Sequence, residues 1–105
     1  MSQEIIDLLV TAQGECREVK RYVRHEDTLQ SHINRFHSLT DKILCRVWHS
    51  KVPAGTMSQL MRLSENIMEG FYFRQVQPSV LEGYLEAAAF ELGVIISRLR
   101  KAMSE

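Results

Sequence analysis

The chain has 105 residues, of which 45% are hydrophobic and 25% are charged. This length fits one domain, and such a domain buries roughly two thirds of the surface that its unfolded chain exposes. A core can therefore form without stabilisation by disulfide bonds or a bound metal. The 13 basic residues equal the 13 acidic ones, which excludes attraction of a polyanion by net charge and leaves only local basic clusters for nucleic acid.

The first predicted element is an amphipathic helix over about residues 3–24. Spacings of four and three keep one face of a helix apolar, and they recur at Ile5, Leu9, Ala12, Cys16, Val19 and Val23. A second helix is expected over about residues 28–50, with Asp27 or Thr28 as its N-cap. Its core face would consist of Leu29, Ile33, Phe36, Thr40, Ile43 and Val47, with Leu39, Leu44 and Trp48 widening it.

The stretch SKVPAGT, residues 50–56, ends the second helix with a proline and a glycine and starts a third with a capping threonine. The third helix is expected over about residues 56–72, with core positions at Met57, Leu60 or Met61, Ser64, Ile67 and Phe71. Pro78 or Ser79 opens a fourth helix over about residues 79–103. Its stripe is the most regular in the chain: Leu81, Leu85, Ala88, Leu92, Ile95, Leu99 and Met103.

Four helices joined by short connections predict one all-α domain, residues 1–105, folded as an antiparallel up-down four-helix bundle. No window approaches the ~18 consecutive apolar residues of a membrane span, and Glu4 and Asp7 stand where a signal peptide carries basic residues. Cys16 and Cys45 are expected to stay reduced, because a domain with an adequate core needs no disulfide. The expected location is therefore the cytoplasm, without membrane contact.

A second apolar stripe flanks the core face of the fourth helix, at Val80, Tyr84, Ala87 and Val94. A helix that is apolar over more than one face usually packs on two neighbours. Two interpretations stay open: the stripe is an interface for self-association, or one wide face fills this bundle.

The four histidines do not predict a metal or catalytic site. His32 and His37 are five residues apart, which places them on different faces of a helix, while His25 falls in a turn and His49 at a helix end. The chain has no Glu-x-x-His, Cys-x-x-Cys, Gly-x-Ser-x-Gly or glycine-rich phosphate loop. We therefore expect a protein that is not an enzyme and has no metal, cofactor or small-molecule substrate.

Basic residues cluster near three predicted helix C-termini, where they interact favourably with the helix dipole and where they could also bind phosphates. In an up-down bundle the second and fourth helices end on the same side, so two of these clusters are expected to share one end. The candidate nucleic-acid contacts are Arg17, Lys20, Arg21, Arg24, Arg46, Lys51, Arg98, Arg100 and Lys101.

The segment NIMEGFYFR, residues 66–74, resembles the Asn-Ile-x-Glu-Gly signature of small four-helix-bundle proteins encoded in bacterial ribosomal-RNA intervening sequences and of the accessory variability determinants of diversity-generating retroelements. The residues that carry it are Asn66, Ile67, Glu69 and Gly70. YLEAAAFELG, residues 84–93, is similar to a Phe/Tyr-Leu-x-x-Ala segment of the family, and residues 36–53 are similar to its first helix leading into a proline.

This resemblance, over about residues 29–103, implies a non-enzymatic bundle that forms rings, commonly pentamers, and that binds RNA, DNA or a reverse transcriptase. The family's basic pair two turns before Asn-Ile is replaced by Met57 and Ser58, and its Gly-Ser by Phe90 and Glu91. The family continues past this point with another helix, whereas this chain has an extra helix before it. The helix order relative to the family is therefore expected to be rearranged.

Two functions follow as hypotheses. The first is an oligomeric accessory or scaffold protein that binds nucleic acid, or an enzyme acting on nucleic acid, through its basic helix ends. The alternative is a protein-interaction adaptor that uses the second face of the fourth helix and the aromatic run Phe71, Tyr72 and Phe73, because exposed aromatic residues are typical interface anchors. Asn66 and Glu69 are expected to hydrogen-bond to each other or to a neighbouring helix.

Overall fold

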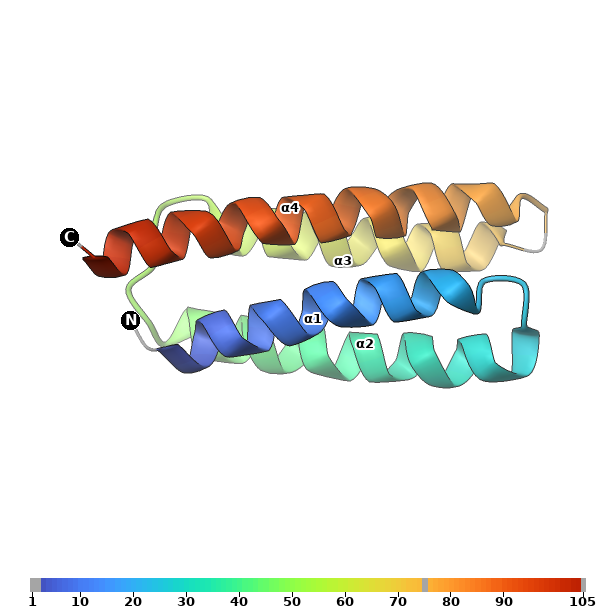
Figure 1. The fold of residues 1–105 in the computed structure, drawn as a ribbon, viewed down its shortest axis with the longest axis horizontal. Helices are drawn as coiled ribbons and strands as arrows, with labels where there is room; N and C mark the ends of the chain where they lie inside the picture. Colours follow the sequence, from blue (N-terminus) through green and yellow to red (C-terminus); the bar gives the residue numbers. More distant parts are fainter. Residues whose placement is uncertain (1–2, 75, 105) are drawn as a thin grey trace.

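The computed structural model describes residues 3–74 and 76–104, which form four helices and no strand (Figure 1). They are α1 (Gln3–Arg21), α2 (Glu26–Trp48), α3 (Thr56–Phe73) and α4 (Pro78–Ser104). Consecutive helices run in opposite directions, and the bundle measures 45 × 19 × 18 Å between Cα atoms. The predicted all-α up-down four-helix bundle is confirmed, with helix ends within three residues of the expected ones.

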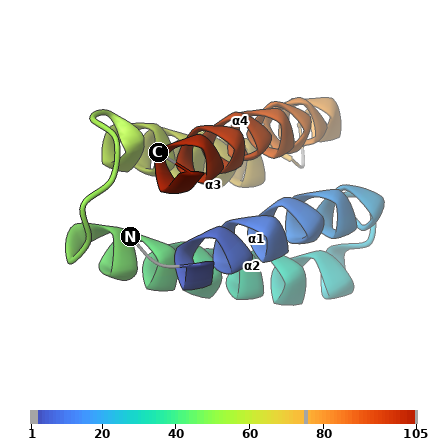
Figure 2. The ribbon, with the colours of Figure 1, turned by 60° about the vertical axis from the view of Figure 1, so that its left-hand side comes forward.

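The helices form two layers, with α1 and α2 in one and α3 and α4 in the other (Figure 2). In the described part of the chain, α1 packs on α2 and α4, and α3 packs on α2 and α4, whereas no Cα atoms of the diagonal pairs come within 8 Å of each other. The segment between α2 and α3 crosses from one layer to the other. None of the helices formed by residues 3–74 and 76–104 combines the length and apolarity needed to cross a bilayer.

The core consists of the apolar stripes of the four helices. Every residue of the two regular stripes predicted for the first two helices is buried, including the hydroxyl-bearing Thr40, whose Oγ1 donates a hydrogen bond to the Phe36 carbonyl (2.9 Å). Of the residues expected to widen the second stripe, Leu39 and Leu44 are half-buried, but Trp48 is 74% exposed, so its assignment was wrong. In α4 the predicted stripe is buried from Leu81 to Leu99, but Met103 in the last turn is 42% exposed, so its assignment to the core was wrong. Three unpredicted residues widen the core: Ile6, Leu63 and Ile96.

The core face of α3 was only partly predicted. Leu60, Ile67 and Phe71 are buried as expected, but Met61 is exposed and Met57 and Ser64 are half-buried. The helix is rotated so that Leu63 and Gly70 also face inward. Gly70 lies inside the helix, and a Cβ atom added there would stand 2.7 Å from Cδ2 of Tyr84 and 3.0 Å from Cα of Leu81. This glycine therefore allows the close approach of α3 and α4.

The helix starts differ from the predicted caps. The N-cap of α2 is His25, which makes no side-chain capping bond, and Asp27 and Thr28 lie in the first turn. The N-cap of α3 is Gly55, whose φ of 88° lies in the left-handed region that glycine adopts without strain. Thr56 does not cap the helix, because its hydroxyl donates instead to the carbonyl of Pro53 (2.7 Å).

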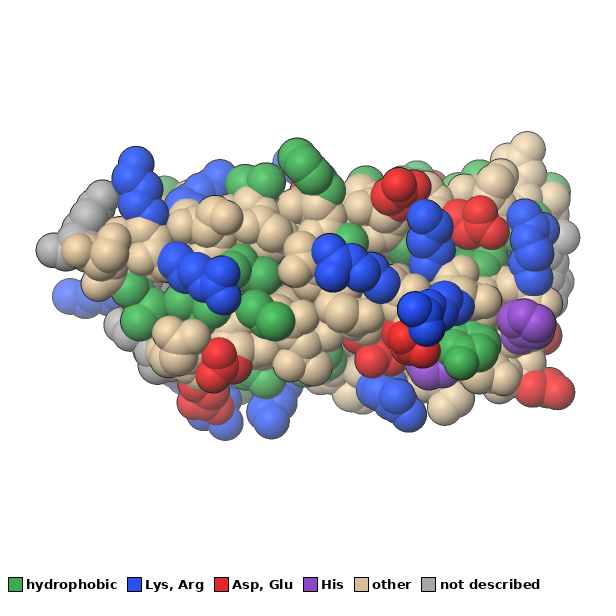
Figure 3. Space-filling view, in the orientation of Figure 1, with side chains coloured by type: hydrophobic (Ala, Val, Ile, Leu, Met, Phe, Trp, Pro, Cys, Tyr) green, Lys and Arg blue, Asp and Glu red, His purple; other side chains and the backbone are tan. Residues whose placement is uncertain are grey.

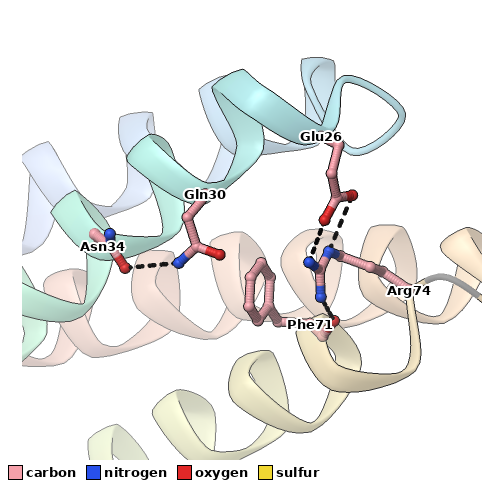
Figure 4. Close-up of polar contacts among 5 residues, drawn as sticks. All are labelled: Glu26, Gln30, Asn34, Phe71 and Arg74. Carbon is pink, nitrogen blue, oxygen red and sulfur yellow. Dashed lines mark hydrogen bonds and ion pairs between the residues drawn. The ribbon is translucent and has the colours of Figure 1, made fainter.

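Arg74 ties the end of α3 to the start of α2 (Figure 4). Its guanidinium forms an ion pair with both carboxylate oxygens of Glu26, donates to the Phe71 carbonyl (2.6 Å) and lies 3.7 Å from the centroid of the Phe71 ring. The Arg74 side chain is only 13% exposed, so this bidentate pair is less screened by water than an ordinary surface pair. It fixes the position of the corner between α3 and α4.

Replacing Gly70 with alanine tests the close approach of α3 and α4. We expect Gly70→Ala to lower the free energy of unfolding by about 1–3 kcal/mol, because overpacking outweighs the roughly 1 kcal/mol by which alanine favours a helix. Ser38→Ala, at an exposed position inside α2, is the control, and it should raise the free energy of unfolding by up to about 0.5 kcal/mol, because alanine favours a helix more than serine does. Urea unfolding measures both, and equal gains in stability would contradict the close packing at Gly70.

Candidate interaction surfaces

The basic residues at the ends of α2 and α4 share one end of the bundle but do not gather on one face. Arg46 forms an ion pair with Glu4 of α1 (3.3 Å), whereas Arg98 donates to Oε1 of Gln59 on α3 (2.9 Å). These contacts draw the two guanidinium groups toward opposite sides of the bundle. The remaining members of this group are exposed: Lys51, Arg100 and Lys101.

The basic cluster of α1 is largely neutralised by neighbouring carboxylates. Lys20 pairs with Glu86 (3.5 Å) and Arg24 with Glu82 (3.4 Å), both on α4, while Arg21 pairs with Glu18 on its own helix (3.7 Å). Exposed pairs of this kind contribute little to stability. They do lower the positive potential that phosphate groups would meet. Arg17, in contrast, has no carboxylate within ion-pair distance in the described residues.

A groove of about 680 Å³ runs between α1 and α4 and opens on the face drawn in Figure 3. Its lining includes the apolar side chains of Phe90 and Val94 and the charged side chains of Arg17 and Lys20. Gln13 reaches across it from α1 and donates to the carbonyl of Ala89 (2.8 Å). A Cβ atom on Gly93 would stand 3.0 Å from Nε2 of Gln13, so this glycine makes room for that bond.

The predicted second stripe of α4 divides into two parts. Val80 and Tyr84 are half-buried, and the Tyr84 ring packs beside Gly70 of α3, so this part helps to fill the bundle. Ala87 and Val94 are exposed. Phe90, which the stripe did not include, is 74% exposed and lies one turn from both.

The aromatic run at the end of α3 also divides. Phe71 is a core residue under Arg74, whereas Tyr72 and Phe73 are 74% and 55% exposed. Val76, in the connection to α4, is 81% exposed. We call Tyr72, Phe73 and Val76 the exposed corner. At the opposite end of the bundle, Trp48 is similarly exposed.

Only two residues of the motif at positions 66–70 take part in packing. Ile67 is buried and Gly70 contacts α4, but the side chains of Asn66 and Glu69 form no hydrogen bond within residues 3–74 and 76–104. The expected hydrogen bonds of these two side chains are therefore not formed. Asn66 is half-buried and Glu69 is exposed.

The histidines occupy helix surfaces and ends. His32 stacks on Tyr22 (centroids 4.6 Å apart, planes within 7°), and its Nδ1 lies 3.2 Å from Oε1 of Glu15. This contact joins α1 to α2 and was not predicted, since it depends on how the two helices are rotated about their axes. His49 ends α2. Among the residues that the structure describes, no three His, Cys, Asp or Glu side chains are grouped so that they could hold a metal ion.

Comparisons with models of known protein families, with curated proteins and with solved structures gave no match.

The two cysteines differ in environment. Cys16 is buried, and this burial, helped by the negative charge of Glu15, raises the pKa of its thiol from 9.0 to about 12. Cys45 is exposed on α2, beside Lys42 and Arg46. Neither thiol is in a disulfide.

Thiol titration tests this difference. At pH 8 we expect one thiol per native chain to react with a disulfide reagent, two after denaturation, and none in native Cys45→Ser.

Above about pH 9 unfolded Cys16 loses its proton while the folded thiol keeps it, so the unfolded state binds fewer protons and stability falls with rising pH. Cys16→Val should therefore show a smaller loss of stability between pH 9 and 11 than the parent chain does.

Substitutions in the motif separate its two halves. Ile67→Ala should lower the free energy of unfolding by about 2–5 kcal/mol, because it empties a buried site. Asn66→Ala and Glu69→Ala should change it by less than about 0.5 kcal/mol, as is usual for surface positions without partners. Thermal and urea unfolding measure the effects, and a loss above 1 kcal/mol in either polar variant would reveal a bond that the structure does not contain.

Proposed function

We propose that this protein is a non-enzymatic adaptor that binds a partner protein through the exposed corner. The observation that carries the proposal is that three large apolar side chains, Tyr72, Phe73 and Val76, lie within five residues and are each more than half exposed. Binding of a partner over apolar surface groups is favourable, because it removes them from water. Tyrosine is also among the residues that most often dominate binding energy.

The exposed corner stands on a fixed base. Arg74, between Phe73 and Val76, is held by Glu26, by the Phe71 carbonyl and by the Phe71 ring. A surface that is already ordered loses little conformational entropy when it binds. The fitting partner is a protein with an apolar groove or pocket that takes two adjacent aromatic rings.

Nucleic-acid binding is the second candidate, and the family resemblance would add a reverse transcriptase as partner and a pentameric ring as assembly. It is supported by the exposed cations Lys51, Arg100 and Lys101 at one end of the bundle. Against it, five of the nine candidate residues are held by acidic or amide side chains: Lys20, Arg21, Arg24, Arg46 and Arg98. The adaptor is therefore the better supported function.

A cytoplasmic location belongs to the same proposal. Its support is the presence of two free thiols, one of them exposed, in a domain of this size. We propose no cofactor and no small-molecule substrate, since the grooves on the described surface combine open apolar and charged walls rather than a set of converging polar groups.

Affinity capture from extract of the source cells, with nuclease and high salt, tests the adaptor. We expect the parent chain to retain a protein partner that the double variant Tyr72→Ser/Phe73→Ser does not retain, because the partner's apolar contacts are lost and salt does not weaken them. Circular dichroism should show unchanged helix content, because both side chains lie outside the core.

The matched control is Arg100→Glu/Lys101→Glu, which reverses two exposed charges at the other end of the bundle and should retain the partner. If capture disappears with nuclease, or if only the charge variant loses the partner, the adaptor is wrong and nucleic-acid binding is favoured, since phosphate contacts weaken steeply with salt.

A further inference from the structure

The outward faces of α1 and α4 each carry a second repeat with spacings of four and three, opposite to the core stripe. Helices that pack along their whole length on another helix show this spacing. On α4 the repeat is Gly83, Ala87, Phe90, Val94, Ser97 and Lys101, and on α1 it is Gln3, Asp7, Val10, Gly14, Arg17 and Arg21. Every one of these residues is exposed.

We propose that this outer face of α1 and α4 binds a second copy of the chain in antiparallel orientation. In such a pair α4 packs along α4 of the second copy and α1 along its α1, related by a two-fold axis. The contact is then isologous, so that each residue pair occurs twice. Dimerisation through this face does not require the exposed corner or its partner.

The sizes of the α4 side chains are self-complementary in this arrangement. Two antiparallel copies of the repeat place Phe90 opposite Ala87 of the second copy, and Val94 opposite its Gly83. Large residues thus face small ones, as interdigitating helices require. A glycine inside a helix costs about 1 kcal/mol relative to alanine, and nothing lies within 4 Å of a Cβ added at Gly83. A closely packed partner helix accounts for this glycine, whereas the single chain does not.

The charges of α1 are complementary in the same arrangement. Antiparallel copies place Asp7 opposite Arg17 of the second copy, and Val10 opposite its Gly14. Within the described residues neither Asp7 nor Arg17 has an ion-pair partner in its own chain, although most charges around them do. Glu4 of one copy and Glu18 of the other lie beside the contact between the two α1 helices. Because Glu4 is already paired with Arg46 and Glu18 with Arg21, the repulsion between these two glutamates is reduced.

One two-fold axis satisfies both helices. The α1 pairs are centred on Ala12, and the α4 pairs are centred between Ala88 and Ala89. These points lie at the same level of the bundle, since the side chain of Gln13 donates to the carbonyl of Ala89 at 2.8 Å. The match is a property of the fold, because sequence spacing alone does not set the relative level of α1 and α4.

The area of the face fits a stable dimer. The Cα extents of the bundle, 45 × 19 Å, allow a footprint of up to about 850 Å², and standard interfaces bury about 800 Å² on each partner. Figure 3 shows that this face carries apolar groups between its charged side chains rather than a continuous charged layer. Phe90 and Val94 also border the groove between α1 and α4, which gives the partner's side chains a hollow to enter.

Charge reversal with rescue tests the pairing of Asp7 with Arg17. By sedimentation equilibrium at micromolar concentration the parent chain should be a dimer. Asp7→Arg and Arg17→Asp should each weaken dimerisation on the order of ten-fold, because two attractive rim contacts become repulsive. The double variant Asp7→Arg/Arg17→Asp should restore the parent affinity. Glu65→Arg on α3 is the control and should change nothing.

Phe90→Glu tests the apolar seam and should weaken the dimer by roughly a hundred-fold or more, since it places two carboxylates in a buried centre. Met61→Glu, at an exposed methionine of α3, is its control. Circular dichroism verifies that each variant folds. A monomeric or pentameric parent chain, a double variant as weak as the single ones, or a dimer that survives Phe90→Glu would each overturn the proposal.

Adaptor binding and dimerisation can be tested separately. Dimer-breaking variants should still capture the partner of the exposed corner, and the Tyr72→Ser/Phe73→Ser variant should still sediment as a dimer. Because the two chains are antiparallel, the two exposed corners of a dimer lie at opposite ends of the assembly. The dimer would therefore present two partner sites on one rigid scaffold.

Discussion

The structure depends on the need of each helix to bury one apolar stripe. Four such stripes are hidden together when every helix packs on two neighbours and the diagonal pairs stay apart, which is the arrangement of residues 3–74 and 76–104. The stripes of α1, α2 and α4 consist mainly of branched aliphatic residues, which fill the space between the layers. On α3 one position of the inward face is instead Gly70, so α3 and α4 approach more closely there. That contact and Arg74 together set where the corner between these helices lies.

Periodicity predicted the fold well for a physical reason. In α1, α2 and α4 one apolar stripe repeats regularly along the helix, so most of the core followed from spacing. In α3, leucine and methionine occupy several adjacent directions, at Leu60, Met61, Leu63 and Met68, and spacing could not choose among them. The choice was made by the partner helices, because rotating Leu63 and Gly70 inward buries a branched side chain and lets α4 approach.

The candidate surfaces could not be predicted to the same extent. Whether a cation is paired depends on the rotation and relative level of two helices, which a single sequence does not contain. Lys20 and Arg24 looked like a basic cluster along α1, but α4 brings Glu86 and Glu82 to the same seam. The three consecutive aromatic residues also differ in burial. Because a helix turns 100° per residue, Phe71 lies in the core whereas Tyr72 and Phe73 point outward. For Arg74 the sequence offered one indication of a role, which is its position directly after the three aromatic residues.

The distribution of charge and apolar surface indicates how such a bundle can distinguish its partners. About half of the Lys and Arg side chains pair with a carboxylate of the same chain, and basic and acidic residues are equal in number. Long-range steering is therefore weak, and recognition has to come from contacts at short range, where shape and desolvation decide affinity. The places that offer such contacts are the exposed corner and the outer face of α1 and α4. They lie on different parts of the bundle, so occupation of one leaves the other open, and a small helical domain can in this way join several chains.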